Sequence, residues 1–255
     1  MSRCARNRIL SVVLVVLFAT LTTFAESGST VVSPAGTSPN NILIGFVGGF
    51  VRHDNPRHGP VRLAQRMHET APKDSYVQVF ENRHRRAAYN TIVRLLDTDH
   101  NGALSESEKS RARVILFGHS WGGSAVVLLA RELRRAGIPV LLTVQVDSVT
   151  KPWQSDSVIP DNVVEAVNFH QPHGMIHGRA QITAADPSKT QILGNYLYDY
   201  RKHPVQCQDP SFFDRVFTPD HAQSECDPKL WSQIEDLVRQ RLATALNTAT
   251  ITSQP

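Results

Sequence analysis

Residues 118–122, GHSWG, place a serine between two glycines, and this spacing could make Ser120 a nucleophile. The predicted strand 113–117, apolar from Val114 onward, precedes the serine, and a helical pattern over 122–136 follows it, which predicts a sharp strand-to-helix turn. Glycine suits the positions two residues away because a side chain there would meet neighbouring backbone. The hydroxyl would then stand at a helix N-terminus, where free N–H groups favour developing negative charge. The alternative is a glycine-rich turn with an incidental serine.

This stretch resembles the nucleophile turn of α/β-hydrolase-fold serine hydrolases, specifically lipase- and esterase-like members. The resemblance covers most of residues 41–245 in element order. It implies a Ser–acid–His triad in that chain order and an oxyanion hole built from two backbone amides. Trp121 would supply one amide, and the loop directly after strand 41–47 would supply the other, from Gly49 or Phe50. The alternative for this loop is an ordinary strand-to-helix turn.

The resemblance implies an acid at the end of a strand that follows the nucleophile helix. Asp147 occupies such a place directly after the apolar run 140–146, as in pancreatic-type lipases. In many other family members the acid lies one strand later, which makes Asp186 the rival. Asp161 and Asp199 are further alternatives, as is the absence of any acid.

The resemblance implies a histidine base in a late loop before the last helix, and His221 fits that place. His221 would take the proton of Ser120, and Asp147 would orient the imidazole and stabilise it once charged. This chemistry needs no organic cofactor. Three other histidines resemble a metal site only loosely, because no acid accompanies them at ligand spacing; they are His170, His173 and His177.

Residues 97–108, DTDHNGALSESE, match a twelve-residue EF-hand calcium loop. A hard cation needs six to eight oxygen ligands, and every liganding position of the pattern is filled acceptably. Gly102 makes the sharp turn at the sixth position. The helix that leaves the loop is short and no second loop is found, so we expect a fixed structural Ca²⁺ rather than a calcium-triggered opening. The alternative is an acidic surface turn. The predicted ligands are Asp97, Asp99, Asn101, the Ala103 carbonyl, Ser105 through water, and Glu108.

Apolar strands and helical patterns alternate along residues 41–245, which predicts an α/β fold. The strands are apolar throughout, so we expect a mostly parallel sheet with helices on both faces, in a single domain. The polar segment 26–40 reads as a flexible leader, and residues 246–255 as a frayed end. Strands are expected at 41–47, 75–80, 113–117, 140–146, 163–169 and 181–184, and helices at 60–70, 82–96, 122–136 and 230–245.

Residues 1–25 read as a secretory signal peptide. Three arginines precede the apolar stretch Ile9 to Ala19, and a small-x-small cleavage site ends at Ala25. The alternative is an uncleaved membrane anchor, although the apolar stretch is short for a span of about 20 residues. Without these 25 residues the chain keeps 24 basic and 23 acidic residues, so the sequence pI of about 9.1 is weak support for a nucleic-acid partner.

Cys207 and Cys226 remain after the signal peptide, and an even pair in an exported chain predicts a disulfide. It would close a loop of about 20 residues and stabilise the fold by roughly 3 kcal/mol on the chain-entropy model. The alternative is two free thiols.

Together these observations predict a secreted or periplasmic serine hydrolase, carboxylesterase- or lipase-like, that cleaves ester or related acyl bonds. The expected partner is a small-molecule or lipid acyl substrate, with no nucleic acid and no stable membrane span after signal cleavage. Two alternatives stay open. One is a non-catalytic calcium-binding module on a hydrolase fold, and the other is an acyltransferase or peptidase that uses the same triad.

Overall fold

The computed structural model describes residue 39 and residues 41–208 and 218–252. The predicted signal peptide, 1–25, lies outside this part of the chain, and so does almost all of the leader. Six parallel strands form the main sheet, in the order β2-β1-β3-β4-β6-β8. They are β1 (Asn41–Val47), β2 (Ser75–Glu81), β3 (Arg113–His119), β4 (Val140–Val146), β6 (Val163–His170) and β8 (Gln191–Leu197).

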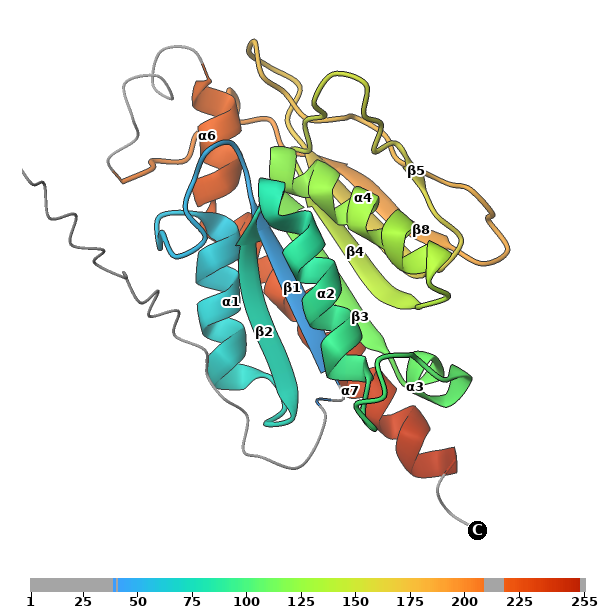
Figure 1. The fold of residues 1–255 in the computed structure, drawn as a ribbon. Coiled ribbons are helices and arrows are strands. Elements are labelled where there is room, and N and C mark those ends of the chain that lie inside the picture. The colour runs from blue at the N-terminus through green and yellow to red at the C-terminus, as the bar shows by residue number, and fades with distance from the viewer. Residues whose placement is uncertain (1–38, 40, 209–217, 253–255) are drawn as a thin grey trace, which may run out of the picture. The chain divides into compact units, whose positions relative to one another are not determined.

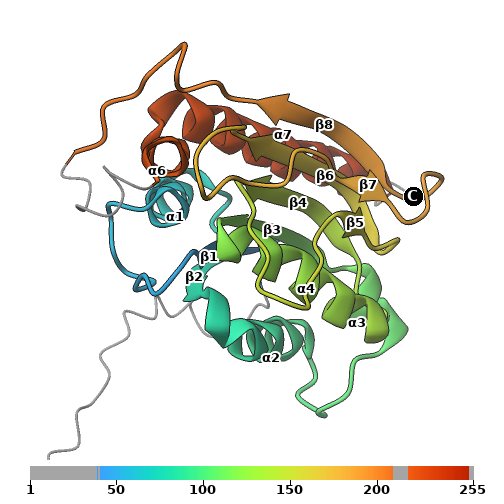
Figure 2. The same ribbon diagram turned by 90° about the horizontal axis from the view of Figure 1, so that it is seen from above.

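Helices cover both faces of this sheet (Figures 1 and 2). One face packs against α1 (Gly59–Thr70) and α7 (Pro228–Thr252), and the other packs against α2 (Arg85–Leu96) and α4 (Trp121–Arg135). The predicted fold class, an α/β domain with a mostly parallel sheet between helices, is confirmed.

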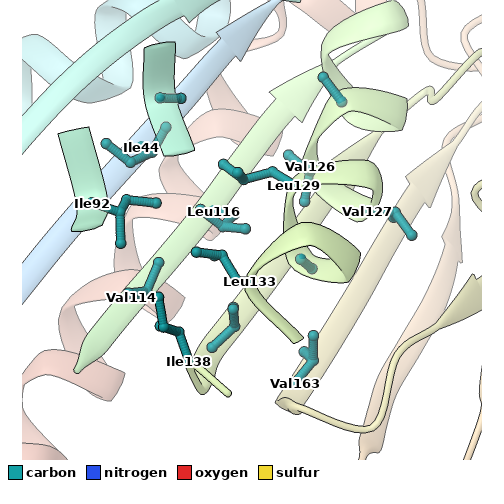
Figure 3. Close-up of a cluster of buried hydrophobic side chains, with 14 of the residues drawn as sticks. Ile44, Ile92, Val114, Leu116, Val126, Val127, Leu129, Leu133, Ile138 and Val163 are labelled. Carbon is teal, nitrogen blue, oxygen red and sulfur yellow. The ribbon is translucent and has the colours of Figure 1, made fainter. Parts of the chain in front are cut away.

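Neighbouring residues of a central strand enter opposite cores, because successive side chains point to opposite faces. In β1, Ile44 packs beneath α2 and α4, whereas Leu43 packs beneath α1 and α7. Figure 3 shows the first of these cores, where Leu116 of β3 meets Leu129 and Leu133 of α4. Each such side chain is fully buried and contributes about 1.5–3 kcal/mol. Burial on both faces explains why these strands are apolar throughout.

Several elements differ from the sequence expectation. β8 was not expected, because its residues are mostly half-exposed at the sheet edge and include Gly194. The predicted strand 181–184 is reduced to β7 (Thr183–Ala184), which pairs with β5 (Val158–Ile159) in a separate two-stranded sheet. Residues 82–96 form a short 3₁₀ turn, η1 (Asn82–His84), followed by α2.

One further helix also differs, and another agrees. The late segment that carries His221 is a helix, α6 (Pro219–Cys226), rather than a loop. The calcium-loop pattern ends in the short helix α3 (Glu106–Ser110), as expected. Helix α7 begins at Pro228 and continues to Thr252.

Among the described residues, no helix combines the length and the apolar character that a membrane crossing requires.

The first turn of α4 packs directly against the end of β1. A Cβ placed on Gly122 would lie 2.2 Å from the carbonyl oxygen of Phe46 and 3.0 Å from that of Val47. Both atoms belong to the backbone of a central strand, so they cannot move aside as the end of a flexible side chain could. Glycine at this position therefore sets how closely the helix approaches the sheet.

We expect Gly122→Ala to destabilise the fold by about 3 kcal/mol, because overpacking against backbone outweighs the gain of about 1 kcal/mol in helix propensity. The free energy of unfolding, from denaturant titration, measures the effect. Ser232→Ala, on the exposed side of α7, is the matched control, and its effect should stay within about 0.5 kcal/mol. A Gly122→Ala protein as stable as the wild type would show that α4 does not pack tightly against β1 at this position.

Candidate active site

Ser120 lies at the carboxyl end of β3 in a strained backbone conformation, with φ 57° and ψ −127°. A positive φ is unusual for a residue with a side chain and persists where surrounding contacts enforce it. Here the Ser120 N–H donates to the Val146 carbonyl at 3.0 Å, and the Ser120 carbonyl accepts from Gly123 and Val149 at 2.9 and 3.2 Å. The half-buried hydroxyl therefore stands beside the first turn of α4, as the glycine spacing predicts.

Asp147 directly follows β4 and is completely buried. One carboxylate oxygen, Oδ1, accepts from the N–H groups of Gly178 and Gln171 at 2.6 and 3.2 Å. The other, Oδ2, accepts from Gln171 Nε2 at 3.0 Å and lies 2.6 Å from His221 Nδ1. Burial alone would raise the pKa of the Asp147 carboxyl, but the hydrogen bonds from His221 and Gln171 outweigh it and lower that pKa.

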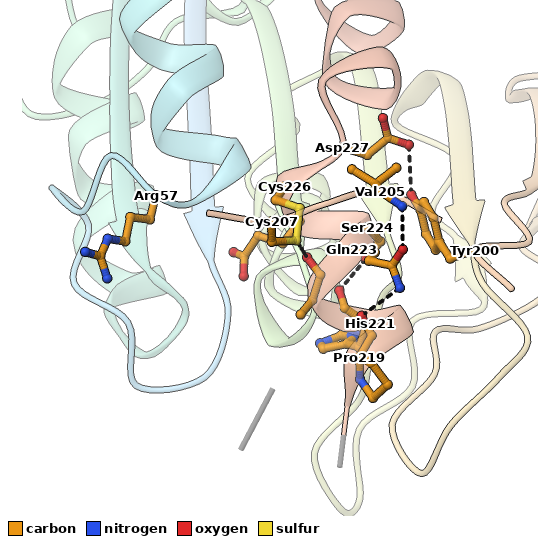
Figure 4. Close-up of a disulfide and its surroundings, with 12 residues drawn as sticks. Arg57, Tyr200, Val205, Cys207, Pro219, His221, Gln223, Ser224, Cys226 and Asp227 are labelled. Atoms are coloured by element: carbon orange, nitrogen blue, oxygen red, sulfur yellow. Dashed lines mark hydrogen bonds between the residues drawn. A yellow bond between two sulfur atoms is a disulfide. The ribbon is translucent and has the colours of Figure 1, made fainter. Parts of the chain in front are cut away.

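His221 comes from α6 and brings its imidazole to the Asp147 carboxylate. Because a carboxylate only accepts hydrogen bonds, Nδ1 carries the proton, and Nε2 of a neutral ring carries the lone pair. Helix α6 is tied down by the disulfide between Cys207 and Cys226, whose Cα atoms are 5.7 Å apart. Figure 4 shows this bridge at the end of the helix that carries His221. The predicted disulfide is therefore present in the structure.

A second histidine packs against the first. The ring centroids of His119 and His221 are 4.6 Å apart. Since the Ser224 hydroxyl donates to the His221 carbonyl at 2.7 Å, it must accept from His119 Nε2, which lies 3.0 Å away. This arrangement places the residue that precedes Ser120 against the imidazole of His221.

A largely buried carboxylate, Glu225, lies behind this histidine. Its Oε1 atom is 3.4 Å from His119 Nδ1 and 2.6 Å from His58 Nδ1. Burial opposes ionisation of Glu225, but the two imidazoles prevail and hold its pKa below the usual range. The sequence offered no signal for this cluster, because its members come from three distant segments.

The loop after β1 meets Ser120. A Cβ on Gly48 would lie 2.7 Å from the Ser120 Cβ and 3.3 Å from its Oγ. The next residue, Gly49, has φ +47°, and a hydrogen bond from Val51 N–H to the Gly48 carbonyl at 3.3 Å closes a turn. Phe50, at the tip, is 84% exposed and its ring makes an edge contact with that of Trp121 at 5.5 Å. The structure thus brings both predicted oxyanion segments beside Ser120.

The other candidate acids lie in separate interactions. Asp186 accepts hydrogen bonds from the N–H and hydroxyl of Ser188 at 3.0 and 2.6 Å. Asp161 pairs with Arg134, and Asp199 lies 3.2 Å from Lys202. In the described part of the chain, none of these three carboxylates contacts His221, whereas that of Asp147 does.

The three clustered histidines do not converge on a common point. His173 Nε2 lies 3.2 Å from Asp199 Oδ1, and His177 Nδ1 lies 3.2 Å from the Gly174 carbonyl. His170 ends β6, and burial lowers its pKa. Where the chain is described, the one group of three metal-type ligand atoms within 4.8 Å of one another lies elsewhere, in residues 97–108.

In that loop the oxygens of Asp97, Asp99 and Glu108 lie within 4.8 Å of one another. The two Asp97 oxygens accept from the N–H groups of Asn101 and Gly102 at 3.1 and 3.0 Å, which curls the backbone around the carboxylate. This gathers three acidic side chains at one place. Such a set of oxygen ligands fits a hard divalent cation.

Glu108 is buried and held by both ends of the loop. Its Oε1 accepts from the Thr98 N–H at 2.6 Å, and its Oε2 accepts from the Ser105 N–H at 2.9 Å. Hydrogen bonds from Ser105 and Thr98 lower the pKa of Glu108 to about 2. The carboxylate is therefore preorganised in its ionised form. The remaining predicted ligands, Asn101, Ala103 and Ser105, are at least partly exposed around it.

No family model matches the sequence, and no curated protein matches it. Among solved structures, the chain is similar to an arylesterase, at 16% identity over 49% of this chain and 42% of that one, with a TM-score of 0.30. It is also similar to a thermostable esterase from Pseudomonas putida ECU1011, at 10% identity over 82% and 76% of the two chains, with a TM-score of 0.40. An acetyl xylan esterase is 11% identical over 81% of this chain and all of its own, with a TM-score of 0.41. Because these identities and TM-scores are low, the function is inferred below from the geometry of the site.

The Glu225 cluster, which consists of His58, His119 and Glu225, makes the stability of the fold depend on pH. We expect Glu225→Gln to lower the free energy of unfolding by about 3 kcal/mol at pH 7, because it leaves two imidazoles facing an uncharged amide. The pKa of Glu225 is lower in the folded chain than its usual 4.5, so this contribution is present above pH 4.5 and is lost as the pH falls below it.

Urea unfolding of both proteins between pH 3 and pH 7 measures the difference. It should shrink on the acid side of this range. Glu69→Gln, an exposed position on α1, is the matched control and should show a small effect throughout. A difference between Glu225→Gln and the wild type that does not change with pH would contradict the assignment of a charged Glu225.

Proposed function

We propose that this protein is an exported serine hydrolase that cleaves ester or related acyl bonds, with Ser120 as nucleophile, His221 as base and Asp147 as the acid that orients it. The observation that carries the proposal is the 2.6 Å contact between Asp147 and His221, made next to a strained, half-buried serine. The Ser120 N–H bonds to the carbonyl of Val146, the residue before Asp147, so the serine and the acid stand at adjacent strand ends.

In the proposed reaction, His221 Nε2 takes the Ser120 proton as the hydroxyl oxygen attacks the acyl carbonyl. The oxyanion of the tetrahedral intermediate is stabilised by the N–H of Trp121 and by the loop after β1. His221 then passes its proton to the departing alcohol, and the acyl group stays on Ser120. Water, deprotonated by the same imidazole, releases the acid and restores the serine. Asp147 keeps the proton on His221 Nδ1 and stabilises the imidazolium in both halves of the reaction, acylation and deacylation.

We also propose that residues 97–108 hold a structural Ca²⁺. The clustered carboxylate oxygens and the preorganised Glu108 support this proposal. When bound, the cation would neutralise the clustered acids and join the end of α2 to α3, just before β3 leads to Ser120. Asp97, Asp99, Asn101, Ala103, Ser105 and Glu108 would supply the ligands.

Export is part of the proposal because the disulfide suits an oxidising compartment. The signal peptide that would direct it lies outside the described residues.

Labelling with a fluorophosphonate probe tests the nucleophile. The wild type should become covalently labelled at Ser120, and Ser120→Ala should not. Asp147→Asn should keep the fold but lower kcat by roughly 10³–10⁴-fold. The His221 imidazole would lose both the acceptor that fixes its tautomer and the negative charge that stabilises its protonated form.

Mass spectrometry locates the label, and ester hydrolysis gives kcat. Asp186→Asn is the matched control and should retain wild-type activity. Labelling that persists in Ser120→Ala would contradict the assignment. An unlabelled, inactive wild type would favour the non-catalytic binding module, and cleavage of peptides in place of esters would favour a peptidase.

Calcium removal tests the metal site. We expect the thermal unfolding midpoint of the wild type to rise on adding millimolar calcium and to fall on chelation, because binding to the folded state stabilises it by mass action. Asp97→Asn should abolish this response, whereas Glu106→Gln, an exposed acid of the same loop that is not a predicted ligand, should preserve it. A wild-type midpoint that is indifferent to calcium and chelator would refute the site.

A further inference from the structure

Asn82 joins the end of β2 to the loop that lies beside Ser120. The side chain is buried, with 5% exposure. Its Nδ2 donates to the Gly49 carbonyl at 2.6 Å and to the Val47 carbonyl at 3.4 Å. A buried amide committed to two carbonyls of one short loop fixes the path of that loop.

Lys151 completes the network from the segment after β4. Its ammonium donates to Asn82 Oδ1 at 2.8 Å. Because an ammonium only donates and a backbone carbonyl only accepts, the two contacts allow a single orientation of the Asn82 amide. The hydrogen bonds therefore run from Lys151 to Asn82 and from Asn82 to Gly49, with every donor facing an acceptor.

This series of hydrogen bonds determines the direction of the backbone N–H that follows the Gly49 carbonyl. In a planar trans peptide the carbonyl and the following N–H point in opposite directions. Since Asn82 holds the Gly49 carbonyl, the Phe50 N–H is directed away from Asn82. The Val51 N–H is already used by the turn, and Gly48 packs against Ser120. Of the two candidate donors, Gly49 and Phe50, the Phe50 N–H is the one that belongs to the peptide held by Asn82.

Lys151 also touches the other predicted oxyanion segment. Its Nζ atom lies 4.8 Å from the centre of the Trp121 ring, a cation–π contact. The Trp121 ring in turn meets that of Phe50. One ammonium group thus contacts both segments whose amides would face the oxyanion.

We propose that Asn82 and Lys151 are positioning residues that orient and polarise the Gly49–Phe50 peptide, so that the Phe50 N–H serves with the Trp121 N–H as an oxyanion donor. This inference rests on the proposed hydrolase function and deepens it. A cation at one end of a series of hydrogen bonds polarises the groups in it and strengthens each bond by about 10–30%. The Phe50 N–H at the far end would then be a stronger donor to negative charge that develops in the transition state.

Two substitutions separate orientation from charge. Asn82→Asp keeps the size of the side chain and its contact with Lys151, but its oxygens cannot donate to the Gly49 carbonyl. It should lower kcat by roughly 10²-fold, the scale of losing one oxyanion donor, with little change in KM. Lys151→Met keeps an apolar chain over Trp121 and removes the charge, and should lower kcat by about 10-fold.

Lys189→Met is the matched control, because Lys189 pairs with Asp161 before the amino ends of β6 and β8, away from Ser120. It should leave kcat unchanged. A boronic acid inhibitor provides a second readout, since its tetrahedral anion occupies the oxyanion position. Its affinity should fall in parallel with kcat in both variants, whereas a loss caused by general loosening would raise KM and lower the thermal unfolding midpoint.

The backbone amide resonance of Phe50, observed by NMR in ¹⁵N-labelled protein, supplies a readout independent of turnover. Its proton shift should move in both variants and stay unchanged in Lys189→Met. A wild type labelled at Ser120, with Asn82→Asp as active as the wild type, would overturn the positioning role alone. A Phe50 resonance that is the same in all proteins would overturn it as well. A wild type that is neither labelled nor active would overturn the proposed function, and with it any role for this network in catalysis.

Discussion

The close contact between the first turn of α4 and the end of β1 is the constraint on which the rest of the site depends. Gly122 lies against the Phe46 carbonyl so tightly that no side chain fits between them. The chain must therefore turn from β3 into α4 within a single residue, and Ser120 takes the strain of that turn as a positive φ. A wider turn would relax the backbone but would lower the hydroxyl into the protein. Strain at Ser120 is thus the physical cost of this tight turn.

Parallel strands bring the remaining groups to the same edge. Asp147 follows β4 beside Ser120, and Gly48 follows β1 on the other side of it. The carboxyl ends of parallel strands lie together, so short segments after each strand meet without long excursions. His221 alone comes from a helix that must be fastened separately, and the Cys207–Cys226 disulfide and the Glu225 cluster fasten it.

Local pattern predicted much of the fold. The strands at residues 41–47 and 140–146 have the same bounds in the structure as in the sequence interpretation, because apolar runs buried on both faces leave a clear signal. β8 escaped prediction since an edge strand with half-exposed side chains has no such run. Helix α6 escaped because its polar sequence, PDHAQSEC, carries little apolar periodicity. Both are held by their neighbours rather than by their own pattern.

What the sequence determined by itself is the strained turn at Ser120 and the acidic loop at residues 97–108, since both depend on residues close together in the chain. Tertiary structure decided which acid meets His221, how His119 and Glu225 brace it, and how Lys151 reaches Asn82 across 69 positions of sequence. The physical reason is the range of the interactions. Turns and loops are specified by steric limits between neighbours, whereas contacts between distant segments depend on which strands lie side by side and in what register.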